Sequence, residues 1–277
     1  QIFTMAADGR DVGLVSTGRG RTTCAYFYPD RPELLYSTTH LADPACPAPP
    51  DRSRGYAWPV HPGYDIVAAD LEGRVLRRLT RAPGYDAEAT IAPDGRHIAF
   101  CSSRDGDLDI YLMDGDGGNV RRLTDRVGYD GGPFFSWDGR YIVYRSRYPE
   151  TPEAEAAYRA DLAQGLVRPA VMDLYVMRAD GGGARRVLSN GAANFAPFLL
   201  PGSERIIFVS NLHDPARRSF ALYLIGVDGT GLERVTYAES FASFPMVSRD
   251  GAKLVFCSTR NAAAPREINV FIADWIP

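Results

Sequence analysis

Three aspartates alternate along one short segment of the chain, at Asp105, Asp107 and Asp109. Carboxylates at alternate positions are typical of a calcium-binding loop, because Ca²⁺ takes its oxygen ligands from a short, turning segment. The glutamate that would complete an EF-hand loop is absent at the required spacing. Asp109 also recurs as Asp65 and Asp173 at corresponding places of a repeat, which favours a structural role in capping or pairing. Calcium binding by Asp105, Asp107 and Asp109 is therefore one of two interpretations.

Three of the four histidines, His40, His61 and His213, fall in segments that interrupt the repeat. Imidazoles can act as acids, bases or metal ligands near neutral pH, and carboxylates lie close by at Asp43 and Asp214. If these segments converge, they would form a metal or acid–base site. The alternative is that the histidines are surface residues, or that they hold their own loops by hydrogen bonds.

Three arginines recur where a strand gives way to a loop: Arg104, Arg147 and Arg260. Guanidinium groups gathered around a central opening would favour an anionic group. The alternative is that each forms a salt bridge with an acidic residue of a neighbouring repeat, such as Asp86, Glu88 or Asp130.

Aromatic residues crowd the same side of the repeat: Tyr26, Tyr56, Trp58, Tyr64, Tyr85, Tyr129, Phe195 and Phe241. Exposed aromatic residues are common anchors of protein interfaces. Aromatic residues that pack between repeats would give the same pattern. Both interpretations of Trp58, Tyr85 and Tyr129 remain open.

The four cysteines match no zinc-binding spacing. Cys101 and Cys257 share the context Phe-Cys-Ser and are expected to pack as small apolar residues. Cys24 and Cys46 differ, since one begins a strand and the other lies in a long Pro-rich segment. We consider a disulfide between them in an oxidising compartment. The Gly-Xaa-Ser-Xaa-Gly motif of serine hydrolases is absent, and no nucleophile stands out.

All these residues are positioned by a repeat that two series of turns reveal. The first series is centred on Asp30, Asp94, Asp138, Gly202 and Asp250. The second series ends on Gly9, Gly73, Gly117, Gly181 and Gly229. Successive members of the second series are 64, 44, 64 and 48 residues apart, and the turns of the first series keep the same spacing. Two series in one register indicate a tandem repeat.

The clearest repeat, residues 88–129, contains four runs rich in β-branched and aromatic residues, separated by Asp-Gly turns. Four strands in about 40–45 residues are typical of a propeller blade. The sequence therefore predicts an all-β propeller of four-stranded antiparallel blades.

Two segments of this repeat, 93–106 and 109–124, resemble the PD40 repeat of the TolB-like propellers, and the resemblance covers nearly the whole chain. It implies a propeller that is usually six-bladed and extracytoplasmic, made with a signal peptide. The same repeat occurs as the non-catalytic propeller of some serine peptidases, and in some lyases.

Composition excludes several classes of protein. The net charge is −3 with mixed signs, so nucleic acid is not an expected partner. No apolar run reaches the length of a transmembrane helix, and the sequence shown begins with a strand rather than a signal peptide. We expect one domain over residues 1–277.

Two blade counts fit the sequence. Residues 1–5 match a third strand and residues 11–16 a fourth, so the sequence begins in mid-blade. We expect six blades with the first one incomplete. The alternative is five blades, the last of which is completed by the N-terminal residues.

Four insertions separate second from third strands. The longest span residues 37–64, which are rich in proline, and residues 149–169, where a short helix is expected over 153–166 with Thr151 as its cap and Pro152 in its first turn. Smaller insertions occupy 211–219 and 261–267. Equivalent connections of a propeller emerge on one face, so we expect one decorated face.

These patterns favour a non-enzymatic, periplasmic or otherwise extracytoplasmic scaffold that needs no cofactor and binds a protein of the cell envelope or of a membrane-anchored complex. The expected contact residues are His40, Trp58, Tyr85, Arg104, Tyr129, Arg147, His213 and Arg260. The alternatives are a metal-assisted lyase or hydrolase with a site in the central funnel, and a glycan or small-ligand binder that uses the aromatic residues.

Overall fold

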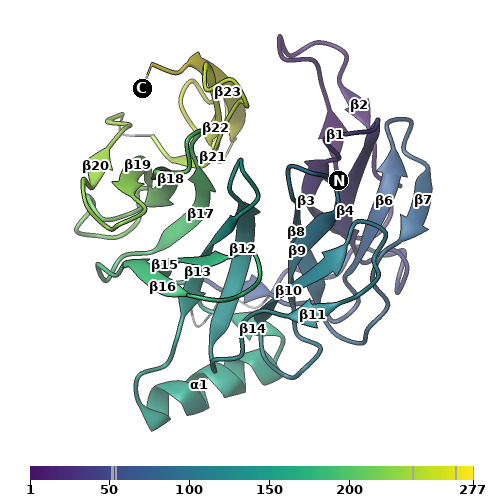
Figure 1. Ribbon diagram of the computed structural model, residues 1–277, viewed down its shortest axis with the longest axis horizontal. Helices are drawn as coiled ribbons and strands as arrows, with labels where there is room; N and C mark the ends of the chain where they lie inside the picture. Colours follow the sequence, from purple (N-terminus) through teal and green to yellow (C-terminus); the bar gives the residue numbers. More distant parts are fainter. Residues whose placement is uncertain (51–52, 54, 239, 266, 277) are drawn as a thin grey trace. The chain divides into compact units, whose positions relative to one another are not determined.

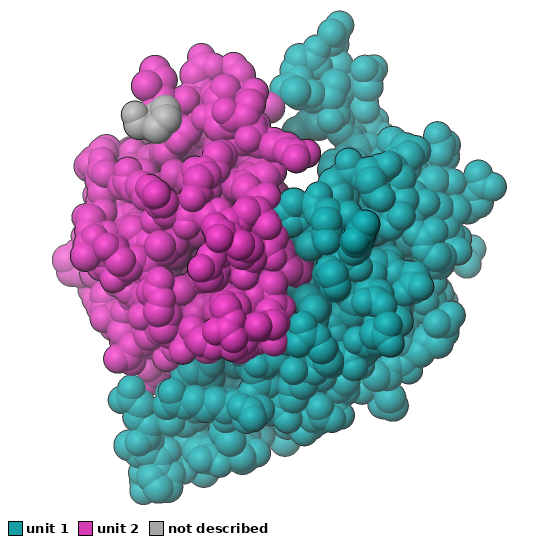
Figure 2. Space-filling model, viewed as in Figure 1, with its two compact units in different colours: residues 1–133, 148–169 teal, residues 134–147, 170–277 magenta. Residues whose placement is uncertain are grey.

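A computed structural model describes residues 1–50, 53, 55–238, 240–265 and 267–276 of the chain. The chain divides into two compact units (Figure 2), residues 1–133 with 148–169, and residues 134–147 with 170–277. Both consist of antiparallel sheets, with a single α-helix among the described residues (Figure 1). The all-β propeller with four-stranded blades is confirmed.

Unit 1 contains two complete blades. Blade 1 consists of β3 (Thr22–Phe27), β4 (Glu33–Thr38), β6 (Asp65–Asp70) and β7 (Val75–Arg78). Blade 2 consists of β8 (Asp86–Ile91), β9 (His97–Ser102), β10 (Asp109–Asp114) and β11 (Arg121–Arg122). Between the two blades lies an apolar core that includes Leu35, Ile66, Ile98 and Phe100.

Unit 2 contains blades 4 and 5 and most of blade 3. Blade 3 consists of β12 (Tyr129–Phe135), which crosses the unit boundary, β13 (Tyr141–Arg147), β15 (Asp173–Arg178) and β16 (Arg185–Leu188). Blade 4 consists of β17 (Asn194–Leu199), β18 (Arg205–Ser210), β19 (Ala221–Gly226) and β20 (Glu233–Arg234). Blade 5 consists of β21 (Ala242–Val247), β22 (Lys253–Ser258) and β23 (Asn269–Asp274).

The first strand of every blade contains one residue in the left-handed region near its start. These residues are Cys24 (φ 50°), Glu88 (φ 58°), Gly132 (φ 59°), Ala196 (φ 43°) and Phe244 (φ 51°). Their spacing of 64, 44, 64 and 48 residues repeats that of the turns. A β-bulge at this point shifts the register of β3, β8, β17 and β21. Only one of the five is glycine, so the fold holds the others against an unfavourable backbone of about 1–2 kcal/mol per residue.

The expected sixth blade is not found: the structure has five blades among the described residues. The N-terminal hairpin, β1 (Phe3–Thr4) and β2 (Gly13–Leu14), forms a separate two-stranded sheet. The Ser16 hydroxyl accepts the backbone N–H of Ile2 at 2.9 Å, as the Thr124 hydroxyl accepts that of Ile110 between β10 and β11. Hence β1 and β2 do correspond to third and fourth strands, but no first and second strand join them among the described residues.

Each insertion lies where the sequence placed it, between second and third strands of a blade. None of the described helices is long and apolar enough to cross a membrane.

Candidate functional site: a loop-built pocket in unit 1

The two longest insertions, which come from blades 1 and 3, pair with each other. β5 (Trp58–Pro59) lies antiparallel to β14 (Leu166–Val167). The Val60 N–H extends this pairing by donating to the Gly165 carbonyl at 2.7 Å. Backbone hydrogen bonds between two loops fix both, so the pair forms one ordered element of unit 1. Residues 51, 52 and 54 of the first insertion lie outside the described residues.

The second insertion contains the predicted helix, α1 (Pro152–Ala163). The helix ends three residues before the expected residue 166, since Gly165 has a positive φ and Leu166 pairs in β14. As expected, Thr151 is its N-cap, whose hydroxyl accepts the Ala154 N–H at 3.2 Å, and Pro152 occupies its first turn. No side chain of α1 is fully buried. A helix that buries so little is held by a few specific contacts rather than by a hydrophobic face.

A hydrogen bond from the Tyr158 hydroxyl to the Asp107 carboxylate joins α1 to blade 2. Burial, and then this bond, raise the pKa of Tyr158, so the phenol stays protonated as the donor. Asp107 also accepts the N–H groups of Leu108 at 2.9 Å and Gly128 at 3.0 Å. The far end of the insertion is held by an ion pair between Arg168 and Asp161 at 2.9 Å.

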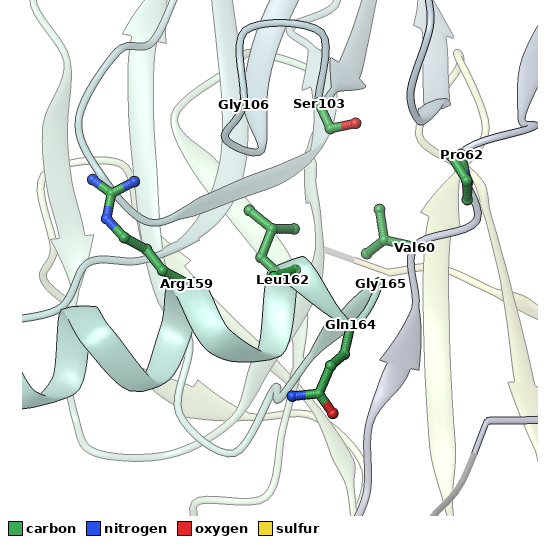
Figure 3. Close-up of a pocket in the computed structure, with 9 residues that line it drawn as sticks. Val60, Pro62, Ser103, Gly106, Arg159, Leu162, Gln164 and Gly165 are labelled. Atoms are coloured by element: carbon green, nitrogen blue, oxygen red, sulfur yellow. The ribbon is translucent and has the colours of Figure 1, made fainter.

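Between α1, the first insertion and the loop that follows β9 lies a pocket of about 660 Å³ (Figure 3). Leu162 and Val60 lie at its centre in this view, with the Ser103 hydroxyl above them. The Arg159 side chain extends from α1 to the side away from Leu162 and Val60 in this view. The volume is typical of ligand-binding pockets, which span about 300–1,000 Å³. Sequence reasoning placed both insertions but missed this pocket.

The three aspartates proposed as calcium ligands engage different partners. Asp105 accepts the hydroxyl of Tyr111, Asp107 accepts the donors given above, and Asp109 binds Arg122 at 2.6 Å. Among the described residues no group of three or more acidic, His or Cys side chains could hold a metal ion. The structure therefore gives the calcium interpretation no ligand cluster.

Asp109 instead joins the third and fourth strands of blade 2. Besides Arg122, its carboxylate accepts the Thr124 hydroxyl at 3.3 Å. Burial raises the pKa of Asp109 to about 6 although Arg122 opposes the shift. Asp65 makes the same contacts in blade 1, which supports the structural interpretation of this position.

Two of the three recurring arginines, Arg104 and Arg260, contact residues of their own blades. Arg104 forms a salt bridge with the buried Asp86 at 3.1 Å and lies over the Phe100 ring. Arg260 lies over the rings of Phe256 and Phe271. The alternative of a salt bridge thus holds for Arg104, although its partner is in its own blade.

Arg147 differs from the other two arginines because it is exposed at the end of β13. The prediction that it contacts a partner stays a prediction.

The candidate aromatic residues of unit 1 differ in burial: Tyr85 and Tyr129 pack inside the unit, whereas Tyr56 is exposed. Tyr85 and Tyr129 are buried, and both hydroxyls donate to the Glu88 carboxylate at 3.3 Å. Trp58 stacks edge-on against Tyr129 with a centroid separation of 6.0 Å. Its indole N–H donates to the hydroxyl of Tyr56, which is exposed. Trp58 is partly exposed, so it remains a candidate contact, whereas Tyr85 and Tyr129 are buried.

Of the three candidate histidines, His40 and His61 lie in unit 1 and His213 lies in unit 2. In unit 1, His40 Nδ1 lies 2.7 Å from the Thr38 hydroxyl, and burial, then Arg19, lower the pKa of His40. In unit 2, burial, then Arg234, lower the pKa of His213. His40 thus holds its own loop, as the structural alternative predicted.

The disulfide that we considered is not present in the structure: Cys24 and Cys46 are both exposed thiols. Cys24 is the bulge residue of β3, and its sulfur lies 3.2 Å from the Thr23 hydroxyl. Both thiols lie near Tyr64, where they add to the effect of burial, which raises the pKa of that phenol to about 12. Cys101 is buried and packs as expected.

Comparison with known proteins agrees with this architecture. Residues 60–160 match the family model described as PD40, TolB beta propeller domain. Over 98% of its length the chain superposes on 83% of a protein described as TolB from Agrobacterium tumefaciens, with a TM-score of 0.67 and 21% identity. TolB from Acinetobacter baumannii gives a TM-score of 0.67 and 18% identity, with 98% of this chain and 56% of that chain covered. The chain has the fold of the TolB-like propellers.

This TolB-like fold also occurs in an enzyme. An oligogalacturonate lyase solved in complex with manganese gives a TM-score of 0.54 and 20% identity, with 91% of this chain and 61% of that chain covered. The chain thus spans less than two thirds of this lyase and of the Acinetobacter TolB. No protein of curated function matches the sequence. Since likeness at such identities concerns the fold, function must be argued from the site.

Proposed function

We propose that this TolB-like propeller is a non-catalytic module that binds a protein partner of the cell envelope, outside the cytoplasm. The observation that carries the proposal is the pairing of β5 with β14, which joins insertions of two blades into one ordered element. A loop that is already ordered loses less conformational entropy on binding than a flexible one, so this element suits recognition.

The exposed groups of this element are those of an interface. Tyr56 and Trp58 offer aromatic surface, Arg159 offers a cation, and the pocket offers a concave apolar wall. Aromatic residues and arginine are enriched at the centres of protein interfaces. The proposed binding needs no cofactor.

An exchange of loops tests this function. Replacing residues 149–169 with the short connection of blade 2, residues 103–108, should leave the blades folded and abolish partner binding. The matched control replaces the insertion 211–219 of unit 2 in the same way. Tagged chains are isolated from native envelopes in mild detergent, and the co-purifying proteins are quantified by mass spectrometry.

The proposal expects one stoichiometric envelope protein with the unaltered chain and with the 211–219 replacement, and its loss with the 149–169 replacement. A partner retained equally by all three chains, or a chain isolated alone, would contradict it. Circular dichroism and urea unfolding establish that both variants fold; failure of the 149–169 variant to fold would overturn the view that this insertion is a grafted binding loop.

A further inference from the structure

Blades 2 and 5 share one arrangement of polar side chains, but only blade 2 contains a carboxylate in it. We propose that blade 5 binds the carboxylate group of a ligand at Arg260, beside the hydroxyls of Ser240 and Ser258. The site lies within unit 2. The inference goes beyond the proposed function, because it involves neither the joined insertions of unit 1 nor their partner.

Blade 2 shows how this arrangement holds a carboxylate. Asp86 at the start of β8 is buried, and its carboxylate accepts the Ser102 hydroxyl at 2.5 Å. One Nη atom of Arg104 donates to both oxygens of Asp86 at 3.1 Å. The Nε atom of Arg104 donates to the Ser102 oxygen at 2.9 Å, which orients the guanidinium toward the carboxylate. Hydrogen bonds from a guanidinium and a hydroxyl thus stabilise the buried charge.

Blade 5 repeats the donors of this arrangement in the same register. Ala242 and Ser258 lie opposite each other in β21 and β22, as Asp86 and Ser102 do in β8 and β9. The backbone N–H and the Nε atom of Arg260 donate to the Ser258 oxygen at 3.2 and 3.1 Å. Blade 5 therefore has the serine and the arginine of blade 2, with alanine in place of the aspartate.

Aromatic rings hold the two guanidinium groups in equivalent positions. The guanidinium carbon of Arg260 lies 4.8 Å from the ring centre of Phe256 and 5.5 Å from that of Phe271. The corresponding distances from Arg104 to the two rings of blade 2 are 5.2 and 4.9 Å. Because the rings restrict Arg260, its guanidinium is already oriented before a ligand arrives.

The hydroxyls of blade 5 have turned to other acceptors. The Ser258 hydroxyl donates to the Phe241 carbonyl at 2.8 Å, and the Ser240 oxygen lies 3.4 Å from that of Ser258. No ion pair of Arg260 is found among the described residues. Ser240 and Arg260 are both partly exposed, so a ligand can reach them from solvent.

The described acidic residues of blade 5 are engaged elsewhere. Glu267 accepts two backbone N–H groups of its own loop and the Asn269 amide. Asp250 accepts the Ser248 hydroxyl and a backbone N–H in the turn at the other end of the strands. Asp274 pairs with Lys253. The charge of Arg260 is therefore left for a ligand.

The chemistry of the ligand follows from blade 2. There, the same donors bind a planar group with two oxygens that share one negative charge, and guanidinium groups match carboxylates in geometry as well as charge. The carboxylate belongs either to a small organic acid or to an acidic side chain of a polypeptide.

Acetate tests the proposal as the smallest carboxylate probe. It is titrated into the full chain at constant ionic strength and followed by the backbone amide NMR shifts of Ser240 and Thr259. Acetamide lacks the charge, and chloride lacks the two oxygens. We expect saturable shifts at millimolar acetate, with binding at least about tenfold tighter than that of acetamide or chloride, since charge-assisted hydrogen bonds are lost in both.

A blocked peptide, acetyl-Ala-Asp-Ala-amide, identifies the source of the carboxylate. Tighter binding of this peptide than of acetate would identify an acidic side chain of a polypeptide as the ligand. Tighter binding of acetate would identify a small organic acid.

Substitutions in blade 5 locate the site. Arg260→Gln should abolish the acetate shifts. Arg249→Gln is the matched control, because Arg249 is an exposed arginine of the same blade, and it should leave them unchanged. Ala242→Asp should also abolish acetate binding and should raise the melting temperature, because the new carboxylate would bind Ser258 and Arg260 as Asp86 binds its partners in blade 2.

The reverse change in blade 2 tests the same comparison without relying on Ala242→Asp. Asp86→Ala leaves Ser102 and Arg104 as donors without their carboxylate. This chain should gain a second acetate site, seen in the backbone amide shifts of Tyr85 and Ser103, and acetate should restore part of its lost stability.

Equal binding of acetate and acetamide, shifts that survive Arg260→Gln, or acetate affinity unchanged in a folded Ala242→Asp chain would each overturn the inference. So would the absence of saturable shifts at millimolar acetate. Glu239 lies outside the described residues, so the titration is repeated with Glu239→Gln. Acetate binding that occurs only in that variant would mean that the chain supplies its own carboxylate, and would also overturn the inference. None of these outcomes affects the test of the 149–169 replacement.

Discussion

The insertions of unit 1 and unit 2 occupy equivalent positions in their blades but use their polar groups differently. In unit 2, the Asp214 carboxylate accepts the N–H groups of Ala216, Arg218 and Ser219, so the loop 211–219 closes on itself. In the last insertion Glu267 does the same with two backbone N–H groups and Asn269. In both loops a carboxylate thus accepts hydrogen bonds from residues of the same loop or of the strand that follows it.

In unit 1 the polar groups of the two insertions form hydrogen bonds with each other and with blade 2. The strands β5 and β14 pair, and Tyr158 reaches Asp107 of another blade. What remains at the surface is a pocket with an apolar wall formed by Val60, Pro62 and Leu162. This difference indicates that the unit 2 insertions only connect strands of their own blades. The unit 1 insertions together form a surface that a partner could contact. The following predictions test that contrast, from the largest effect to the smallest.

Removal of Asp107 should have the largest effect in unit 1. Asp107→Ala leaves Tyr158 and two backbone N–H groups without their acceptor, at a cost of about 2–4 kcal/mol in the free energy of unfolding. Tyr158→Phe removes only the contact of α1 and should cost about 1 kcal/mol. Urea unfolding gives both values, and amide exchange should show faster exchange in α1 for both variants. Unchanged protection of α1 in Tyr158→Phe would mean that something other than this hydrogen bond holds the helix.

The corresponding change in unit 2 should act only on its own loop. Asp214→Ala removes the acceptor of three N–H groups, so residues 211–219 should exchange faster, with a smaller loss of stability than Asp107→Ala causes. Exchange in α1 should not change. An effect of Asp214→Ala on partner binding would break the contrast between the two units.

Two carboxyl groups, Asp109 of unit 1 and Asp214 of unit 2, should contribute to stability with opposite pH dependence. The pKa of Asp109 is raised from 3.8 to about 6, so its contribution to stability is full below about pH 4 and is lost as the pH rises through 6. The pKa of Asp214 is lowered by the N–H groups of Ser219, Arg218 and Ala216, so its contribution is present above about pH 4 and is lost as the pH falls further.

Urea unfolding between pH 3 and pH 7 separates these two effects. Asp109→Asn should flatten the curve between about pH 4 and 6 and leave the acid limb in place. If the variant keeps the slope of the unaltered chain there, Asp109 is not the group responsible.

The smallest effect concerns the two exposed cysteines. We predict that oxidation joins Cys24 to Cys46 and ties the first insertion of unit 1 to β3. Intact mass with and without reductant should differ by two hydrogens, and Cys46→Ser should remove the difference while Cys257→Ser should not. Rapid alkylation of Cys46 in the oxidised native protein would show that the bond does not form.

The repeat could be predicted from sequence because particular residue types mark its turns. Asp-Gly turns, β-branched runs and the Thr151–Pro152 helix start each follow from local backbone preferences, and all are found. β8 begins at Asp86, two residues before the expected start of its repeat at residue 88, because a bulge at Glu88 interrupts the alternation that marks a strand.

The site was less accessible to sequence reasoning. β5 and β14 are two residues each, too short to carry a periodic pattern, and their pairing joins segments about a hundred residues apart. The role of Asp107 depends on Tyr158, which nothing in the sequence links to it. The recurrence of Asp109 did predict its structural role, since a position repeated in several blades is explained by the blade.

The central claim, that the joined insertions of unit 1 contact the partner, is tested most directly by site-specific photo-crosslinking in native envelopes. A photoreactive residue replaces Gln164 at the end of α1 in one chain and Arg218 in the loop of unit 2 in another; both positions are exposed. We predict one dominant crosslinked envelope protein from position 164 and none from position 218. The same product from both positions, or a product from position 218 alone, would contradict the account.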